Sequence, residues 1–322
     1  MASEMKLFEH PDFDQLVTET RRHLNIPGLT EQLIEKDYFV TELLRVVALR
    51  LPTQVLFKGG TSLSKAWQLI HRFSEDVDLF VDPQKFAPAL GKRGIDRELK
   101  TLRDSVAQHP AFQLIEGKTS GGFGRSDHFR YPQHFGGVAA IRDTVLLESG
   151  TASGREPVVT VVLESYVARY LRDKEIDMGA EDQTDFPMQV MHFRRTFVEK
   201  LFAIHGKVEI FKRDGYPITT YARHYYDLFC LLQQQEVLLM LTQAEYASIK
   251  EDYKRVSLAY FPRDYFEPTD MRFANSDALF PAPGLRNSLD EAYRTQCANL
   301  CYGPFPTFQE VLQAFENVRD RI

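Results

Sequence analysis

Apolar and polar residues alternate at helical spacing through the first fifty residues. Residues 7–25 form one amphipathic stretch, which ends before Pro27 and Gly28. A longer stretch runs from about residue 30 to residue 50, and Pro52 ends it. The pattern therefore predicts two N-terminal helices.

The pattern changes to that of strands at residues 55–82. Residues 55–57 form an apolar run typical of a buried strand, and two glycines interrupt it. Residues 61–70 have the spacing of a helix, and residues 72–81 alternate as a second strand does. This stretch predicts a strand, a glycine turn, a helix and a second strand in succession.

Beyond residue 83 the chain divides into a strand-rich part and a helix-rich part. Helical spacing covers residues 84–108, with an interruption at 91–94. Short apolar runs between glycines predict strands at residues 112–116, 127–135, 144–148, 158–163 and 188–193. Helices are predicted at about 196–207, 221–235, 242–257 and 307–321.

Two of the later helices have a signal for their first turn. Thr196 with Glu199, and Thr307 with Glu310, have the spacing of a capping box. Residues 262–306 are rich in Pro, Asn and Gly, and no regular element is predicted there.

These elements predict an α/β (α+β) fold in which helices flank a mixed β-sheet and a helical C-terminal half follows. The polar residues 179–182 suggest a linker. We therefore expect a first domain over residues 1–185, including the N-terminal helices, and a mainly helical second domain over residues 186–322.

Composition fits a globular protein without membrane segments. Of the 322 residues, 43% are hydrophobic and 26% charged, and no apolar run has the length of a membrane span. The three cysteines are too few for a disulfide framework. Cys297 and Cys301 have helical spacing, which favours buried free thiols over a metal pair. We expect a cytoplasmic protein.

The net charge of −6 argues against a general polyanion binder but not against a local basic surface. One basic stretch is little diluted by acids and could face phosphates. It contains His192, Arg194, Arg195, Lys200, His205, Lys207, Lys212, Arg213 and Arg223. A second basic group, between residues 85 and 103, is interspersed with acids and is typical of a solvated helix face.

The strongest chemical signal is a pair of aspartates on the second predicted strand of residues 55–82. Asp76 and Asp78 share one face because strand side chains alternate, and Val77 and Leu79 take the other. Like charges are costly to bury unpaired, so the acidic face is expected to meet solvent or a ligand. Two such carboxylates can hold Mg²⁺ or Mn²⁺ against a polyphosphate.

A glycine turn precedes the helix next to this strand. Gly59 and Gly60 let a phosphate approach backbone N–H groups at the helix N-terminus, and Thr61 or Ser62 can cap the helix or bind the phosphate. Lys65, one turn further on, can reach the same phosphates. A turn of this kind is also an ordinary strand-to-helix connection; the neighbouring aspartates favour a site for the phosphates of a nucleoside triphosphate.

Three further positions are candidates for the same site. Nucleotidyl transfer often uses a third metal-binding carboxylate, for which Glu148 is the first candidate and Glu164 the second. Glu148 could equally be a solvent-facing residue at a strand end. Lys200 is not needed for helix capping, and Asp227 lies one turn from His224, either as a polar pair within a helix or as part of a site.

The order of these motifs resembles the AbiEii/AbiGii-type nucleotidyltransferase toxins. The matching stretches are Glu-Lys-Asp-Tyr at 35–38, Phe-Lys-Gly-Gly-Thr-Ser-Leu-Ser-Lys at 57–65, Arg-Phe-Ser-Glu-Asp-Val-Asp-Leu at 72–79, Thr-Phe-Val-Glu-Lys-Leu at 196–201 and His-Tyr-Tyr-Asp-Leu at 224–228. The central motif is specific, and the resemblance covers about residues 35–232.

The resemblance implies the nucleotidyltransferase fold of the DNA-polymerase-β-like superfamily. Such proteins are toxins of bacterial toxin–antitoxin systems and are linked to abortive infection by phage. Some members transfer nucleotides to the 3′ end of tRNA and thereby block translation. The residues that the resemblance carries over are Asp76 and Asp78 for metal, Gly60, Thr61 and Lys65 for the NTP phosphates, and Lys200 and Asp227, from the second domain, to complete the catalytic site.

We therefore expect a Mg²⁺-dependent toxin that moves a nucleoside monophosphate from an NTP to RNA, with tRNA as the expected acceptor and a cognate antitoxin encoded nearby. Two alternatives remain open at this point. The acceptor could be a protein or a small molecule, or the chain could be a non-catalytic module that binds a partner.

Overall fold

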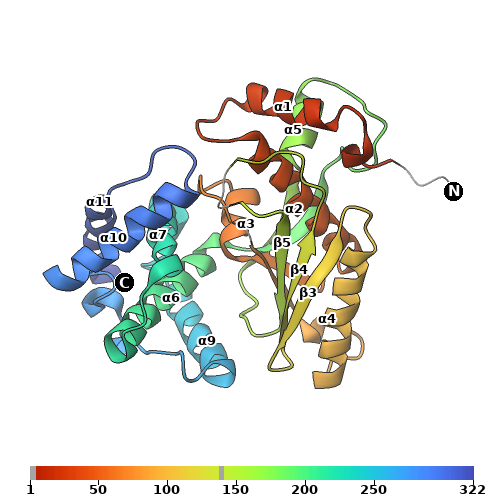
Figure 1. The fold of residues 1–322 in the computed structure, drawn as a ribbon. Coiled ribbons are helices and arrows are strands. Elements are labelled where there is room, and N and C mark those ends of the chain that lie inside the picture. The colour runs from red at the N-terminus through yellow and green to blue at the C-terminus, as the bar shows by residue number, and fades with distance from the viewer. Residues whose placement is uncertain (1–4, 75, 138–140) are drawn as a thin grey trace. The chain divides into compact units, whose positions relative to one another are not determined.

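The computed structural model describes residues 5–74, 76–137 and 141–322, and the chain divides into two units (Figure 1). The first unit consists of residues 1–66, 73–151 and 158–190. The second consists of residues 67–72, 152–157 and 191–322. The chain thus enters the second unit twice, briefly, before its C-terminal part, which the sequence did not lead us to expect.

A seven-stranded sheet forms the centre of the first unit. Its strands lie in the order β3-β4-β5-β2-β1-β7-β6. β1 pairs antiparallel with β2 and parallel with β7, while β2 pairs parallel with β5, so the sheet is mixed as predicted. The strands are β1 Val55–Lys58, β2 Asp76–Val81, β3 Gln113–Ser120, β4 Gly124–Arg130, β5 Thr144–Gly150, β6 Val158–Leu163 and β7 Phe186–Met191.

Strand boundaries agree best with prediction where an apolar run has clear ends. β1, β5 and β6 lie where the sequence predicted strands. β2 begins at Asp76 rather than at residue 72, and β4 begins and ends before the predicted 127–135. Arg72, where the strand was expected to begin, belongs to the second unit, and alternation alone does not reveal that.

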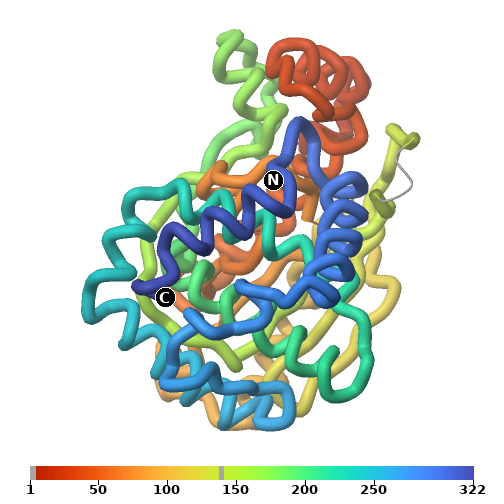
Figure 2. The backbone as a smooth tube through the Cα atoms, turned by 90° about the vertical axis from the view of Figure 1, so that its left-hand side faces the viewer, coloured from red at the N-terminus to blue at the C-terminus, as the bar shows by residue number. Residues whose placement is uncertain are grey.

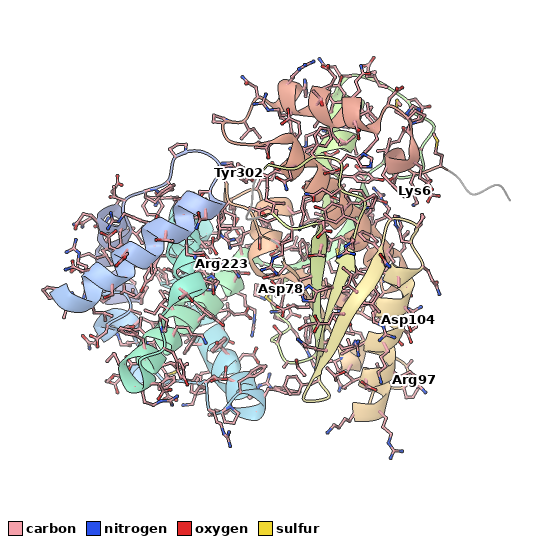
Figure 3. All side chains as sticks on the ribbon, in the orientation of Figure 1. Lys6, Asp78, Arg97, Asp104, Arg223 and Tyr302 are labelled. Carbon is pink, nitrogen blue, oxygen red and sulfur yellow. The ribbon has the colours of Figure 1, made fainter. Side chains whose placement is uncertain are left out.

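Helices cover the sheet of the first unit. Helix α2 begins after Thr30, whose side chain accepts a hydrogen bond from Leu33 N at 3.3 Å. Helices α1 and α5 pack against α2, and α4 packs against α2 and β4; Arg97 and Asp104, labelled in Figure 3, lie on α4. The helices are η1 Leu7–Glu9, α1 Phe13–Leu24, α2 Glu31–Arg50, α3 Gly59–Lys65, η2 Pro83–Lys85, α4 Lys92–Ala107 and α5 Tyr166–Asp173.

The long helices of the first unit lie where the sequence predicted them, whereas one short helix has different bounds and another was not predicted. The helix expected at residues 61–70 begins earlier, at Gly59, and ends at Lys65. Helix α5 was not predicted, although Ser165 caps it by accepting a hydrogen bond from Ala168 N.

The stretch expected to be a polar linker, residues 179–182, is tied to the first unit. Asp182 is fully buried, accepts a hydrogen bond from Leu7 N at 2.9 Å and is hydrogen-bonded to the hydroxyl of Tyr38. Arg45 donates to the carbonyl oxygen of Asp182 at 3.1 Å. A buried carboxylate with these partners is structural rather than part of a linker.

The second unit is helical, as expected for the C-terminal half. α6 and α7 pack together, and α10 and α11 pack against α7; Figure 2 shows the blue C-terminal end of the chain. Its helices are α6 Phe193–Asp214, η3 Thr219–Ala222, α7 Arg223–Leu232, α8 Gln235–Met240, α9 Ala244–Tyr260, η4 Thr269–Met271, η5 Phe273–Asn275, α10 Pro283–Leu300, α11 Phe308–Glu316 and η6 Arg319–Arg321.

One prediction for this unit was wrong and one is confirmed, and one helix lies where no element was predicted. Residues 262–306 contain the helix α10, which has Pro283 at its first position. The capping box at Thr196 does not exist, because α6 begins at Phe193 with His192 as its N-cap. The capping box of Thr307 and Glu310 is present.

Among the described residues, no helix combines the length and apolar content that crossing a membrane requires. The three cysteines are free thiols; Cys297 is buried as expected, whereas Cys301 is only half-buried.

Candidate active site

Asp76 and Asp78 lie half-buried on one face of β2, with Asp78 labelled in Figure 3. Val77 and Leu79 point to the opposite face and are 0% and 2% exposed. The alternation predicted from the sequence is therefore confirmed, and the acidic side chains share a face.

A row of polar residues crosses the sheet at Asp78. Asp78 is the register partner of Lys58 on β1 and of Glu148 on β5, and Glu148 is the partner of Ser126 on β4. The Ser126 hydroxyl donates to Glu148 Oε1 at 3.3 Å. Since register partners point to the same face, the sheet brings Glu148 beside the two aspartates.

The charges of this row act on Glu148. Partial burial of its carboxyl group raises the pKa of Glu148, and the negative charges of Asp78 and Asp76 raise it further. The hydrogen bond from Ser126 and the charge of Lys58 oppose this rise only in part. The row therefore has an excess of negative charge, which a divalent cation would relieve.

Glu164, the second candidate for a third carboxylate, has other partners. Its carboxylate pairs with Arg169 Nε at 2.9 Å and with Arg172. It follows β6, at the edge of the sheet and three strands away from β2. Glu148 is therefore the better-placed candidate.

Across the described residues, no three His, Cys, Asp or Glu side chains are already arranged as metal ligands. The donor set of Asp76, Asp78 and Glu148 nevertheless fits Mg²⁺, because hard cations prefer carboxylate oxygens. Binding would require these side chains to turn toward a common point.

Gly59 is required by its neighbour Asp78. Its φ is +77°, a conformation that residues with a side chain adopt only with strain. A Cβ at this position would lie 2.0 Å from Asp78 Oδ2. The glycine therefore leaves space for the Asp78 carboxylate, a role that differs from the approach of a phosphate predicted from the sequence.

The hydroxyl groups of Thr61 and Ser62 bond within the protein. Thr61 Oγ1 donates to the carbonyl oxygen of Asp76 and so joins α3 to β2, and Ser62 Oγ donates to Gly59 O at 2.8 Å. Gly60 lies in the first turn of α3, where N–H groups have no partner within the helix. Phosphate contact by these residues stays a prediction.

Lys65 is buried and paired with Asp37 of α2. The Lys65 Nζ lies 2.7 Å from Asp37 Oδ1, and Asp37 Oδ2 accepts a hydrogen bond from Tyr166 N at 2.8 Å. Burial lowers the pKa of Lys65, and the charge of Asp37 opposes the shift. This ion pair joins α2, α3 and α5, and the predicted contact of Lys65 with phosphate is untested.

The second unit contains its own buried charge cluster. Asp227 on α7 is fully buried and lies 2.7 Å from Lys200 Nζ of α6. Arg72 donates to it twice, through Nε at 2.6 Å and Nη2 at 2.8 Å. Burial alone would raise the pKa of Asp227, but the charges of Arg72 and Lys200 outweigh burial and hold it well below its usual value.

His224 completes this cluster. Its Nδ1 lies 3.1 Å from Lys200 Nζ and 3.5 Å from Asp227 Oδ2. Burial and the positive charge of Lys200 lower the pKa of His224 to about 3, so the ring is neutral at neutral pH. A neutral Nδ1 can accept a hydrogen bond from the lysine.

Arg72 was missed by the sequence reasoning, which treated it as the start of a strand. It is 2% exposed and forms a β-bridge with Cys301. Its partner Asp227 is 155 residues away along the chain, so no local pattern reveals the pair.

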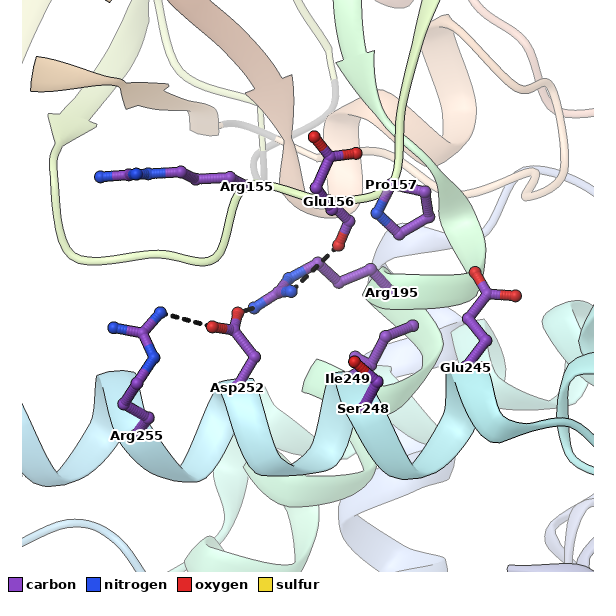
Figure 4. A pocket seen from close by; sticks show the side chains of 9 residues that line it. All are labelled: Arg155, Glu156, Pro157, Arg195, Glu245, Ser248, Ile249, Asp252 and Arg255. Atoms are coloured by element: carbon purple, nitrogen blue, oxygen red, sulfur yellow. Dashed lines mark hydrogen bonds and ion pairs between the residues drawn. The ribbon is translucent and has the colours of Figure 1, made fainter. Parts of the chain in front are cut away.

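The basic stretch at residues 192–223 is largely an ion-pair network. Arg195 donates to Glu199 at 2.9 Å, to Asp252 at 2.7 Å and to the carbonyl oxygen of Glu156 at 3.0 Å; Figure 4 shows the latter two contacts. Arg194 lies 3.2 Å from a carboxylate oxygen of Glu245. These cations are balanced within the unit, so the stretch as a whole is not the phosphate-facing surface we expected.

The predicted site residues thus form two groups. The acidic row, which consists of Asp76, Asp78 and Glu148, belongs to the first unit together with the glycine turn. Lys200 and Asp227 belong to the second unit. That both groups serve one reaction stays a prediction.

Comparison with known proteins gives three results. Residues 42–314 match a family model described as "Nucleotidyl transferase AbiEii toxin, Type IV TA system". A solved structure described as "putative nucleotidyltransferase from H. pylori" shares 17% sequence identity, with a TM-score of 0.39 over 83% of this chain and 97% of that chain. A search of curated proteins finds no match.

Proposed function

The chain belongs to the AbiEii family of nucleotidyltransferase toxins, and from this we propose that it transfers a nucleoside monophosphate from an NTP to RNA, with the 3′ end of tRNA as the expected acceptor. The observation that carries the proposal is the row in which Asp78 has Lys58 on one side and Glu148 on the other, with Asp76 on the same face.

The acidic row would hold Mg²⁺ or Mn²⁺, which supplies charge neutralisation for the triphosphate and orients it for in-line displacement. The acceptor hydroxyl attacks the α-phosphorus, the bond from this phosphorus to the bridging oxygen of the β-phosphate breaks, and pyrophosphate leaves. Lys58, next to Asp78 in the row, would place a positive charge near the phosphates.

Lys200 is the residue of the second unit that we assign to the reaction. A lysine ammonium is a compact charge that can stabilise the negative charge on a triphosphate. Asp227 and the neutral His224 hold the ammonium in place. Asp227 is therefore a positioning residue for Lys200 in this proposal.

The direct test is labelling of RNA. Purified protein is incubated with total bacterial RNA, Mg²⁺ and each of the four α-³²P-NTPs, and labelled RNA is expected with at least one nucleotide. Label that survives RNase and is lost on protease treatment would instead establish a protein acceptor.

Variants connect the activity to the acidic row. Replacing a residue that only hydrogen-bonds to a metal ligand typically lowers metal affinity or activity by about 10–100-fold. Asp76→Asn and Asp78→Asn, which alter proposed ligands themselves, are therefore each expected to lose at least about 100-fold in transfer. Asp96→Asn is the matched control, because Asp96 is a partly exposed acid on α4 that lies 2.8 Å from Lys100 and outside the row at Asp78. Full activity in Asp78→Asn would remove the metal assignment.

The toxin role has a separate test. Induced expression in a bacterial host is expected to stop translation and growth, and Asp78→Asn is expected not to. Co-expression of a neighbouring antitoxin gene is expected to restore growth.

A further inference from the structure

The second unit contains a hollow of about 250 Å³ that is lined by aromatic side chains. Phe202 of α6 is buried and stacks on Tyr253 of α9, with ring centroids 4.3 Å apart and planes 14° from parallel. Tyr221 and Phe261 also line the hollow and are 37% and 41% exposed. The hollow thus has a buried aromatic base and exposed aromatic residues where it meets solvent.

The size and shape of the hollow limit its ligand. Pockets for drug-sized molecules measure about 300–1,000 Å³, so this hollow suits a smaller group. Aromatic walls favour a flat ring, because offset stacking and edge contacts both stabilise planar ligands.

Two residues with charged side chains, Lys207 and Asp264, are among those that line the same hollow. Lys207 Nζ lies 4.3 Å from the ring centroid of Tyr221. Within the described part of the chain, Lys207 forms no ion pair with an acid, in contrast to Arg194 and Arg195. The exposed carboxylate of Asp264 can accept a hydrogen bond from an amino group.

The hollow shares a wall with the buried charge cluster of the same unit. The Tyr221 ring packs edge-on against the ring of His224, with centroids 5.6 Å apart. His224 in turn contacts Lys200 and Asp227. A ligand against Tyr221 would therefore be separated by two side chains, Tyr221 and His224, from the lysine that we assign to the reaction.

We propose that this hollow binds a nucleobase, which stacks on the exposed aromatic residues. Lys207 binds the phosphate attached to the nucleoside, and Asp264 accepts a hydrogen bond from an exocyclic amino group, as carboxylates do from cytosine. The inference rests on the proposed function for the source of the base, which is either the NTP donor or an unpaired base of the acceptor RNA.

The test is equilibrium binding without divalent metal, so that it is independent of transfer. The probes are CMP, AMP, UMP and a short fluorescein-labelled single-stranded RNA. Tyr221→Ala and Phe261→Ala are each expected to weaken binding by about 5-fold to 150-fold, which corresponds to the 1–3 kcal/mol of one base–aromatic stack. Tyr216→Ala is the control, because Tyr216 is 68% exposed in the same unit and does not line the hollow.

A second variant narrows the hollow without removing a side chain. A Cβ on Gly206 would lie 3.4 Å from the carbonyl oxygen of Asp264, an ordinary contact, so Gly206→Ala is expected to fold and to bind more weakly. Asp264→Asn is expected to weaken CMP and AMP more than UMP, since uracil has no amino group.

The outcomes separate this inference from the proposed function. Loss of mononucleotide binding alone assigns the hollow to the donor, and loss of RNA binding alone assigns it to the acceptor. If the hollow variants bind every probe as the unaltered protein does, the inference is wrong, even where RNA labelling proceeds. Asp78→Asn, which is expected to lose transfer, should keep its binding in this assay.

Discussion

The carboxylate of Asp78 occupies the space that a side chain at Gly59 would need, since a Cβ there would lie 2.0 Å from Asp78 Oδ2. The glycine turn and the acidic strand therefore pack directly against each other, although Gly59 and Asp78 are 19 positions apart in the sequence. A substitution at Gly59 is therefore expected to displace the Asp78 carboxylate.

Gly59→Ala is expected to lose nucleotidyl transfer by moving Asp78. The positive φ alone costs about 1–2 kcal/mol for a residue with a side chain, and the displaced carboxylate adds to this cost. RNA labelling and urea unfolding measure the two effects. Gly284→Ala is the control, because nothing lies within 4 Å of a Cβ at Gly284. Unchanged transfer in Gly59→Ala would mean that the position of Asp78 is not critical.

Arg72→Met is expected to lower mainly the stability of the protein, and Lys200→Met is expected to lower mainly its transfer activity. Loss of Arg72 leaves Asp227 buried without its two hydrogen bonds from the guanidinium, which should cost about 3–5 kcal/mol in the free energy of unfolding. Lys200→Met keeps the Arg72 pair, so it should unfold at higher urea than Arg72→Met and yet lose at least about 100-fold in transfer, comparable to a lost transition-state contact. Arg255→Met, at an exposed arginine, controls for the loss of positive charge. A Lys200→Met protein with full transfer would contradict the role of Lys200.

The Lys65–Asp37 pair allows a test of the phosphate contact predicted for Lys65. Asp37→Leu leaves a buried cation unpaired and is expected to cost about 3–5 kcal/mol of stability. Adding Lys65→Met removes that cation, so the double variant should regain most of the loss. Because the ion pair accounts for Lys65 without a phosphate, we expect transfer to return as well. A double variant that is stable but transfers poorly, with a raised KM for NTP, would instead support the phosphate contact.

Two buried groups have opposite effects on stability between about pH 6.5 and 4.5. Burial raises the pKa of Glu42 to about 7, so the folded state takes up a proton before the unfolded state does and gains stability as pH falls. Burial and the charge of Lys6 lower the pKa of His109 to about 4, so the unfolded state is protonated first and the protein loses stability as pH falls. Glu42 Oε2 and His109 Nε2 lie 3.9 Å apart, and neither atom has a hydrogen-bond partner among the described residues.

Glu42→Gln removes the first effect and should reveal the second. Relative to the unaltered protein, its free energy of unfolding is expected to fall more steeply as pH decreases, by up to about 1.4 kcal/mol per pH unit between about pH 6.5 and 4.5. Urea unfolding at several pH values measures the slope. If Glu42→Gln and the unaltered protein change in parallel, the two pKa shifts do not oppose each other.

The sequence predicted the parts of the fold and the candidate site that depend on local pattern. Alternation around Val77 was enough to place Asp76 and Asp78 on one face, and Thr307 with Glu310 was enough to place the start of α11. Local pattern does not predict the partner of a side chain when that partner is distant in the sequence. Glu199 has the spacing of a capping partner for Thr196, yet it pairs with Arg195, which also binds Asp252 of α9.

Long-range partners explain the other differences. Arg72 has the alternation of a strand residue, but its place is set by Asp227. Asp182 lies in a polar stretch typical of a linker, but Leu7, Tyr38 and Arg45 bury it. In each case a charged side chain is buried with a partner that is more than a hundred residues away, and only the folded chain brings the two together.

Residues 67–72 and 152–157, the two short segments that belong to the second unit, affect when its contacts can form during synthesis. The chain passes from one unit to the other five times, after residues 66, 72, 151, 157 and 190. Arg72 leaves the ribosome early, but Asp227 and Lys200 follow more than a hundred residues later, so the buried charge cluster cannot close until most of the chain has been made. A chain released before residue 200 is made therefore contains the acidic row but lacks Lys200 of α6 and Asp227 of α7. No single cut yields either unit as a continuous piece. If Lys200 and Asp227 serve the reaction as we propose, such an incomplete chain is expected to be inactive.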